Sequence, residues 1–103
     1  MRTVINVNSG GDINKLLIPG RYRLSPGGSY YNLPTPASGN DCYVTVEYTT
    51  NTAINILQTI VYRRGNVPMT IRRFIASNSA DPYPSGRFTY ANWYADAEPT
   101  ILM

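Results

Sequence analysis

Apolar and polar residues alternate without interruption over the stretch CYVTVEYT, residues 42–49. Side chains of a strand point alternately to its two faces, so this alternation predicts a β-strand with one buried face. The face that we expect to be buried carries Cys42, Val44, Val46 and Tyr48.

Two further stretches repeat the pattern and predict an antiparallel meander. In residues 53–64 the apolar side carries Ile54, Ile56, Gln58, Ile60 and Tyr62. In residues 70–77 one side carries Ile71, Arg73 and Ile75, and the other carries Thr70, Arg72, Phe74 and Ala76. We expect a turn at residues 51–52 and a loop from Arg64 to Met69 to join these strands.

The first part of the chain predicts a short strand, a helical turn and a second strand. Residues 3–7 alternate, and the stretch NSGG ends them. Asp12 is a good N-cap for a turn over residues 13–17, because its carboxylate can accept free backbone N–H groups. The Pro19-Gly20 pair then turns the chain into a strand, residues 21–24, with Tyr22 and Leu24 on one face and Arg21 and Arg23 on the other.

Proline and glycine mark two long loops, residues 25–40 and 78–86, and loops of this length are often functional. Residues 87–93 predict a final strand. The apolar tail that ends the sequence, residues 100–103, predicts either a segment docked on its own sheet or a subunit contact. As candidates for the core we take Val44, Val46, Ile54, Ile56, Ile60, Ile71, Phe74 and Trp93.

The composition fits one small domain that is stabilised by neither disulfides nor a structural metal. The chain has 103 residues, one cysteine and no histidine, so neither an internal disulfide nor a structural zinc site has its ligands. Residues 1–11 lack the apolar core of a signal peptide, and no apolar run approaches the roughly 18 residues of a membrane helix. We therefore expect synthesis in a reducing cytoplasm, no membrane insertion and no cofactor.

The sequence lacks the residue combinations that hydrolytic enzymes commonly use for catalysis. Without histidine, Ser-His and Cys-His pairs cannot form, and Lys15, the one lysine, lies on the predicted helical turn. A glycosidase needs two carboxylates that face each other across a cleft, but Glu47 is the one acid placed firmly in a strand, and it faces outward. The pair Gly10-Gly11 lacks the spacing and the lysine of a phosphate-binding loop. We predict that the protein is not an enzyme.

The charge pattern leaves two interpretations open. The net charge is +3 and eight of the nine basic residues are arginine. This is too sparse for the basic stripe of a nucleic-acid-binding domain, so we expect no nucleic acid. Arg63-Arg64 and Arg72-Arg73 flank one predicted loop. They either bind phosphate, acidic sugar or an acidic protein surface, or they are solvent-facing residues and inter-subunit ion pairs; we favour the second.

The order of several short motifs resembles a known family. A unit with Asp12-Ile13-Asn14, Leu16 and Pro19-Gly20-Arg21-Tyr22 leads to Asn32-Leu33-Pro34, then to the meander, and the aromatic segment 87–93 closes the pattern. This resembles the pyocin-knob domain of phage tail fibres and contractile-tail particles, over residues 12–93. The resemblance implies a small β-rich knob with one short helical turn, often trimeric and carried on virions.

The fold class that we predict is therefore mainly β: a single knob-like domain over residues 1–103, built as a small antiparallel sheet or sandwich. The expected function is that of a virion structural protein of the tail-fibre or baseplate knob type, which recognises a host-surface polysaccharide or attaches to other virion proteins of the fibre. The alternative is a capsid decoration protein or head fibre.

The candidate contacts with a ligand or partner are the aromatic residues of the loops and the closing segment, together with one arginine: Tyr30, Tyr31, Tyr83, Arg87, Tyr90, Trp93 and Tyr94. The candidate charged surface or interface residues are Arg63, Arg64, Arg72 and Arg73.

Overall fold

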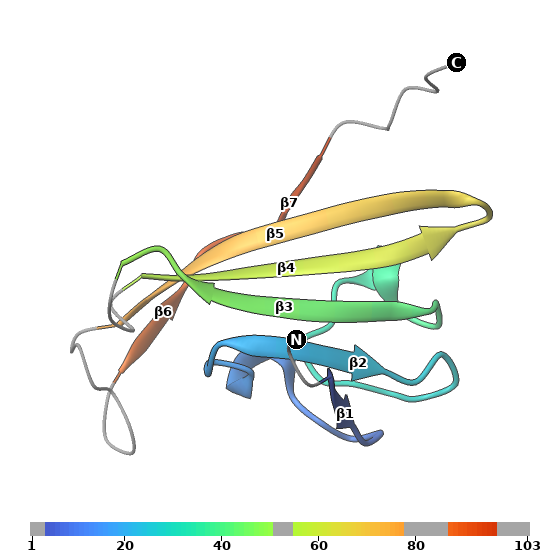
Figure 1. Cartoon of the computed structure of the whole chain (residues 1–103), viewed down its shortest axis with the longest axis horizontal. Coiled ribbons are helices and arrows are strands. Elements are labelled where there is room, and N and C mark those ends of the chain that lie inside the picture. Colours follow the sequence, from blue (N-terminus) through green and yellow to red (C-terminus); the bar gives the residue numbers. More distant parts are fainter. Residues whose placement is uncertain (1–3, 51–54, 78–86, 97–103) are drawn as a thin grey trace.

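The computed structural model describes residues 4–50, 55–77 and 87–96. These residues form one seven-stranded sheet with two short 3₁₀ turns, which confirms the prediction of a mainly β fold, as a single sheet (Figure 1). The strands run across the sheet in the order of the sequence, with β7 paired to β5. Their bounds are Val4–Val7 (β1), Gly20–Leu24 (β2), Cys42–Tyr48 (β3), Asn55–Arg64 (β4), Val67–Ser77 (β5), Phe88–Tyr90 (β6) and Tyr94–Ala95 (β7).

The meander of β3, β4 and β5 is longer than predicted at its turn. The expected loop from Arg64 to Met69 is wrong, because Arg64 pairs with Val67 around a two-residue turn at Gly65-Asn66. Gly65 has a φ of 61°, the conformation that a hairpin turn of this length needs at its first position. Pro68 pairs with Arg63, and the backbone N–H of Arg63 points away from β5 and donates to the Asp41 carbonyl. The pair is therefore one in which the two residues exchange no backbone hydrogen bonds, so Pro68 fits in β5 without an N–H.

The first two strands are parallel, so the expected antiparallel sheet is wrong at this edge. Parallel strands need a crossover connection, and here residues 8–19 supply it. The crossover contains the 3₁₀ turn η1 (Ile13–Lys15), and the predicted cap is confirmed, since the Asp12 carboxylate accepts from the backbone N–H of Asn14 at 2.9 Å. Ile13 and Leu17 are buried against the sheet, so the capped turn packs its apolar residues into the core.

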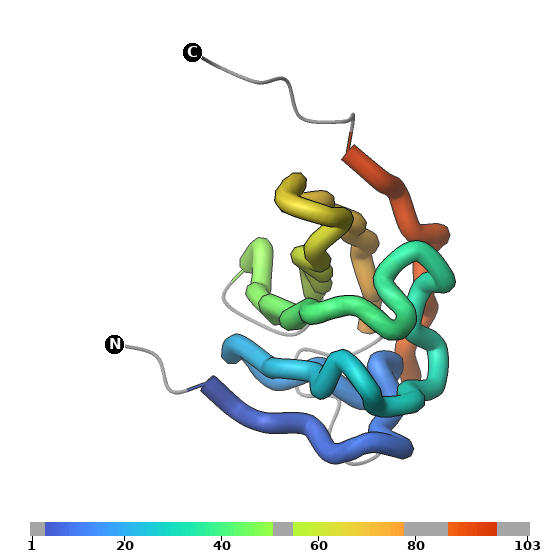
Figure 2. The backbone as a smooth tube through the Cα atoms, turned by 90° about the vertical axis from the view of Figure 1, so that its right-hand side faces the viewer, coloured from blue at the N-terminus to red at the C-terminus, as the bar shows by residue number. Residues whose placement is uncertain are grey.

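The loop from Ser25 to Asn40 folds over the same face of the sheet. The Tyr30 hydroxyl donates to the carbonyl of Val7 and accepts from the N–H of Ser25, both at 2.8 Å. A second 3₁₀ turn, η2 (Thr35–Ala37), buries Ala37. In Figure 2 the teal part of this loop and the red C-terminal strands of the sheet, β6 and β7, both lie at the right of the view. The core lies between one sheet and its own loops.

The last predicted strand, residues 87–93, is interrupted by a β-bulge. Tyr90 pairs with Ile75 and Tyr94 pairs with Arg72, so the three residues 91–93 lie opposite only two residues of β5. An extra residue of this kind turns the following side chains to the other face. Tyr90 and Trp93 are three positions apart, and the bulge lets both rings face Arg73 from the inner side.

A buried polar network joins η1 to the sheet. The Gln58 amide, which has no exposed surface, donates to the carbonyls of Ile13 and Leu16, both at 2.8 Å. Arg73 donates from Nε to Gln58 Oε1 at 2.9 Å and from Nη2 to Asn14 Oδ1 at 2.7 Å. Because Gln58 and Arg73 are buried, each of these bonds satisfies a polar group that water cannot reach.

Most of the predicted core is confirmed. The candidates that are buried are Val44, Val46, Ile56, Ile60 and Ile71. Trp93 is half-buried and packs against this cluster. Phe74 as a core residue is wrong: its side chain is 55% exposed, because it alternates with the inward Arg73 and Ile75. Ile54, the turn at residues 51–52, the loop 78–86 and the tail 100–103 lie outside the described residues.

Candidate functional site

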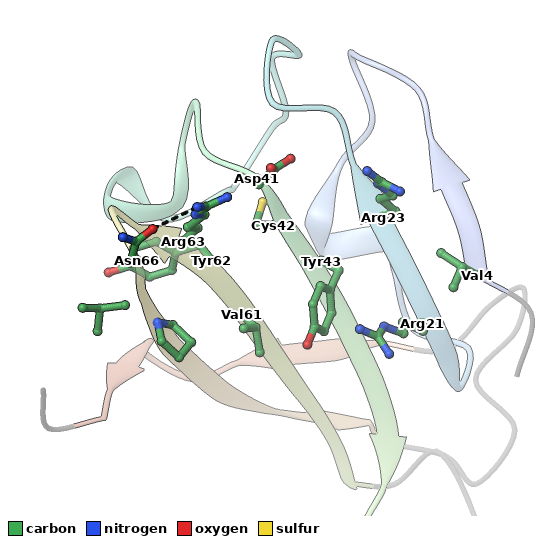
Figure 3. Close-up of a pocket in the computed structure, with 12 residues that line it drawn as sticks. Val4, Arg21, Arg23, Asp41, Cys42, Tyr43, Val61, Tyr62, Arg63 and Asn66 are labelled. Atoms are coloured by element: carbon green, nitrogen blue, oxygen red, sulfur yellow. Dashed lines mark hydrogen bonds between the residues drawn. The ribbon is translucent and has the colours of Figure 1, made fainter. Parts of the chain in front are cut away.

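A groove of about 510 Å³ crosses the outward face of the sheet near the β4–β5 turn. Five neighbouring strands contribute to it, from β1 to β5. Figure 3 shows Arg63 and Asn66 on one side, Arg21 and Arg23 on the other, and Tyr43 and Val61 between them. The lining residues are Val4, Arg21, Arg23, Asp41, Cys42, Tyr43, Val61, Tyr62, Arg63, Asn66, Val67 and Pro68.

Strand register explains why these side chains meet. Arg23 pairs with Tyr43, and Tyr43 pairs with Val61, so the three form one row across β2, β3 and β4. Side chains in such a row point to the same face. Arg21 and Arg63 lie two residues along their strands from this row and therefore share its face. The inward neighbours of the same strands, such as Val44 and Ile60, belong to the core.

Three arginines line the groove: Arg21, Arg23 and Arg63. The carbon of the Arg21 guanidinium lies over the Tyr43 ring, 3.9 Å from its centroid. Arg63 donates from Nε to the Gly65 carbonyl at 2.7 Å and from Nη2 to Asn66 Oδ1 at 3.0 Å, which fixes its position. Of the acids, Asp41 lines the groove. Three guanidiniums against one carboxylate give the groove a net positive charge suited to an anion.

Cys42 lines the groove but belongs to the core, and it is a buried thiol rather than a reactive one. Burial raises its pKa to about 11, and the neighbouring Asp41 carboxylate acts in the same direction. A thiol with a raised pKa is mostly protonated at neutral pH and is a poor nucleophile. This fits the prediction that Cys42 lies on the buried face of its strand.

The two predicted arginine pairs do not form one cluster. Arg63 lines the groove, and Arg64 is exposed next to it and makes other contacts within the protein. Arg72 pairs across the strands with Thr59 instead, far from the turn, and forms an ion pair with Asp96 at 2.9 Å. Only Arg63 of these candidates therefore takes part in the groove.

Arg73 as a charged surface residue is wrong, because its side chain is buried and only 5% of the residue is exposed. Burial lowers the pKa of its guanidinium to about 10, while Tyr90 and Asp12 act in the opposite direction, so it stays charged at neutral pH. It lies between Trp93 and Tyr90, 4.1 and 4.9 Å from the ring centroids. Together with its hydrogen bonds to Gln58 and Asn14, this makes Arg73 a structural residue.

The predicted aromatic contacts are spread over several places. Trp93 and Tyr90 hold Arg73, and the Tyr90 hydroxyl donates to the Asn14 carbonyl at 2.8 Å. Tyr30 has a structural role, because its hydroxyl is hydrogen-bonded to the backbone of Val7 and Ser25. Tyr31, 67% exposed, lines a smaller depression of about 280 Å³ with Ser9, Gly10, Ser29 and Tyr30. Tyr94 is 66% exposed on β7.

The two remaining candidates give no support to an aromatic site. Arg87 is exposed and engages other groups of the protein, and Tyr83 lies outside the described residues. The aromatic candidates therefore do not form a common surface in the described part of the chain.

Sequence reasoning missed Arg21, Arg23, Asp41 and Tyr43 as site residues. Alternation had placed Arg21, Arg23 and Tyr43 on outward faces, and this is correct. The missing information was the register between β2, β3 and β4, which brings these residues beside Arg63. In the described residues, no group of three or more metal-ligating side chains comes together. The helical segments found there are too short to span a membrane.

We compared the chain with protein-family models, with curated proteins and with solved structures, and none of the three comparisons gives a match. The functional argument is therefore based on the residues of the groove.

Proposed function

We propose that this protein is a non-enzymatic phage virion protein of the tail-fibre or baseplate knob type, and that its groove recognises a host-surface polysaccharide. The observation that supports this most is the gathering of Arg21, Arg23 and Arg63 around Tyr43 on one outward face. Side chains of this kind bind polar ligands through guanidinium forks and aromatic contact area. The sequence resemblance to pyocin-knob domains points to the same class of protein.

The chemistry of the groove supports binding over catalysis. Its lining includes one carboxylate, Asp41, whereas glycoside hydrolysis uses two on opposite sides of the bond. Asp12 is engaged as a cap and Asp96 as the partner of Arg72. We therefore expect purified protein to bind a polysaccharide without shortening it.

Two measurements test this proposal. Gold-labelled antibody against the protein should mark the tail tips or the baseplate of the phage that encodes it. Excess purified protein should slow adsorption of that phage to its host. Label on the capsid faces would instead support the decoration role, and unchanged adsorption kinetics would refute host recognition.

Assembly into a trimer is part of the proposal. β1 is an edge strand with Val4 and Ile5 about half exposed, and such edges pair readily with another chain. Analytical ultracentrifugation of the full chain should give a mass near three times the monomer. A monomer at high concentration would refute self-assembly and leave the groove argument intact.

A further inference from the structure

The polar groups of the groove have mixed sign, and this limits its ligands. Arg21, Arg23 and Arg63 supply cationic donors, whereas Asp41 supplies only acceptors when ionised. A ligand made only of negative charge would satisfy the arginines but would face Asp41 as a like charge. The ligand that fits must offer both an anionic group and hydroxyl donors.

The arginines keep unused donors in positions that the fold determines. A guanidinium has five N–H groups, and the hydrogen bonds from Arg63 to Gly65 and Asn66 use two of them. The Arg21 guanidinium contacts the Tyr43 ring, and among the described residues its N–H groups have no hydrogen-bond or ion-pair partner. Among the described residues, the side chain of Arg23 has no hydrogen-bond or ion-pair partner. Because Arg21 and Arg63 are already held in place, less side-chain entropy is lost when a ligand binds them.

The width between the arginines fits one sugar ring. Arg23 and Val61 are two strands apart in one row, and Arg63 lies two residues further along β4. With strands about 4.8 Å apart and a rise of about 3.3 Å per residue, the Arg23 and Arg63 Cα atoms are roughly 12 Å apart. Their side chains therefore approach a ligand from opposite sides. Tyr43 and Val61 lie between the two arginines, and the apolar surface of Val61 suits the C–H face of a pyranose ring.

We infer that the groove binds a carboxylate-bearing sugar of the uronic acid type within the host polysaccharide, an inference that rests on the proposed function. The sugar carboxylate accepts from Arg23 at one side of the ring, and a hydroxyl oxygen at the opposite side accepts from Arg63. The sugar hydroxyls donate to Asp41 and to the Asn66 side-chain oxygen. A phosphate group on a polysaccharide offers the same bidentate anion. Asp41 disfavours it, because a phosphate brings more charge and fewer hydroxyl donors to that position.

The test is calorimetric titration of the full chain with galacturonate, mannuronate and glucuronate oligomers. The methyl ester of each oligomer is the uncharged match, and a phosphate-bearing glycan of similar length is the second arm. At least one uronate should bind, and its methyl ester should bind about tenfold more weakly or worse. The affinity for the uronate should also fall as the salt concentration is raised. Equal affinity for acid and ester would overturn the inference, as would failure of all uronates to bind or tighter binding of the phosphate glycan.

Variants connect this binding to the groove. Arg23→Ala and Arg63→Ala should each weaken uronate binding about 10-fold to 100-fold, because each removes a charge-assisted hydrogen bond. Arg72→Ala is the matched control, since Arg72 is an exposed arginine on β5 outside the groove, and it should bind as the parent does. Unchanged uronate binding by both groove variants, with unchanged melting temperatures, would refute the assignment.

One further variant separates the two anions. Asp41→Asn should improve binding of the phosphate glycan relative to the uronate, because it removes the like charge, and no change in this ratio would contradict the role given to Asp41. The outcomes also separate this inference from the proposed function. Protein that blocks phage adsorption but binds acid and ester equally retains the proposed function and loses the uronate assignment. Protein that binds uronates without affecting adsorption loses the proposed function instead.

Discussion

Replacing Gln58 by alanine should destabilise the protein mainly through lost hydrogen bonds. The loss of packing contacts alone would give a smaller effect. The side chain is fully buried and makes three hydrogen bonds, to the carbonyls of Ile13 and Leu16 and to Nε of Arg73. Each buried carbonyl left without a donor costs about 1 kcal/mol or more, and the bond to the charged guanidinium is worth about 1.5–3 kcal/mol. We expect the free energy of unfolding to fall by about 3–5 kcal/mol.

Urea denaturation followed by tryptophan fluorescence measures this loss, since Trp93 lies over Arg73 within the network. Gln58→Met is a variant of similar volume that removes the hydrogen bonds without leaving a large cavity, so it should be almost as unstable as Gln58→Ala. Thr59→Ala, at the adjacent outward position, is the control and should change stability little. A Gln58→Ala protein within about 1 kcal/mol of the parent would refute the argument. Recovery in Gln58→Met would show that the loss comes from a cavity and not from hydrogen bonds.

Two other predictions concern single side chains near the core. Asp12→Ala should lower stability by about 0.5–2 kcal/mol, because it removes the acceptor of the Asn14 N–H, and should leave uronate binding unchanged; loss of binding at constant stability would make Asp12 a site residue. Cys42 has a pKa of about 11 in the folded state against 9.0 when free, so it contributes stability that is complete below pH 9 and lost as the pH rises through 11. Cys42→Ala should flatten the fall in melting temperature over that range, and equal slopes for the two proteins would contradict the burial argument.

The sequence was sufficient for those parts of the fold that depend on local pattern. The alternation in residues 42–49 determines which side chains of β3 are buried, and the cap at Asp12 follows from the chemistry of one side chain. The turn at Gly65-Asn66 is also a local signal. The expected loop from Arg64 to Met69 was too long, because it included Val67 and Pro68, which pair within the sheet. A proline is tolerated in a strand where its nitrogen faces away from the neighbouring strand.

Features that depend on distant parts of the chain could not be predicted in this way. The parallel pairing of β1 with β2 depends on how the crossover packs its apolar residues, and the bulge before Trp93 depends on Arg73, twenty residues earlier. Arg63 was a candidate from the sequence as one of a pair of basic residues. Arg21 and Arg23 become site residues only through the register of three strands, which the alternation of any one strand does not contain.

The inner face of β4 and β5 stabilises the fold, whereas the outer face lines the groove, so residues of the groove can be substituted separately from those of the core. On the inner face, Gln58 and Arg73 tie the crossover to the sheet, so substitution there changes stability. On the outer face, Val61 and Arg63 line the groove, and their side chains are not part of the core. Because strand residues alternate between faces, the groove can be altered without disturbing the buried network. A binding surface of this kind can vary its ligand while the fold is retained, which is what attachment to differing host polysaccharides would require.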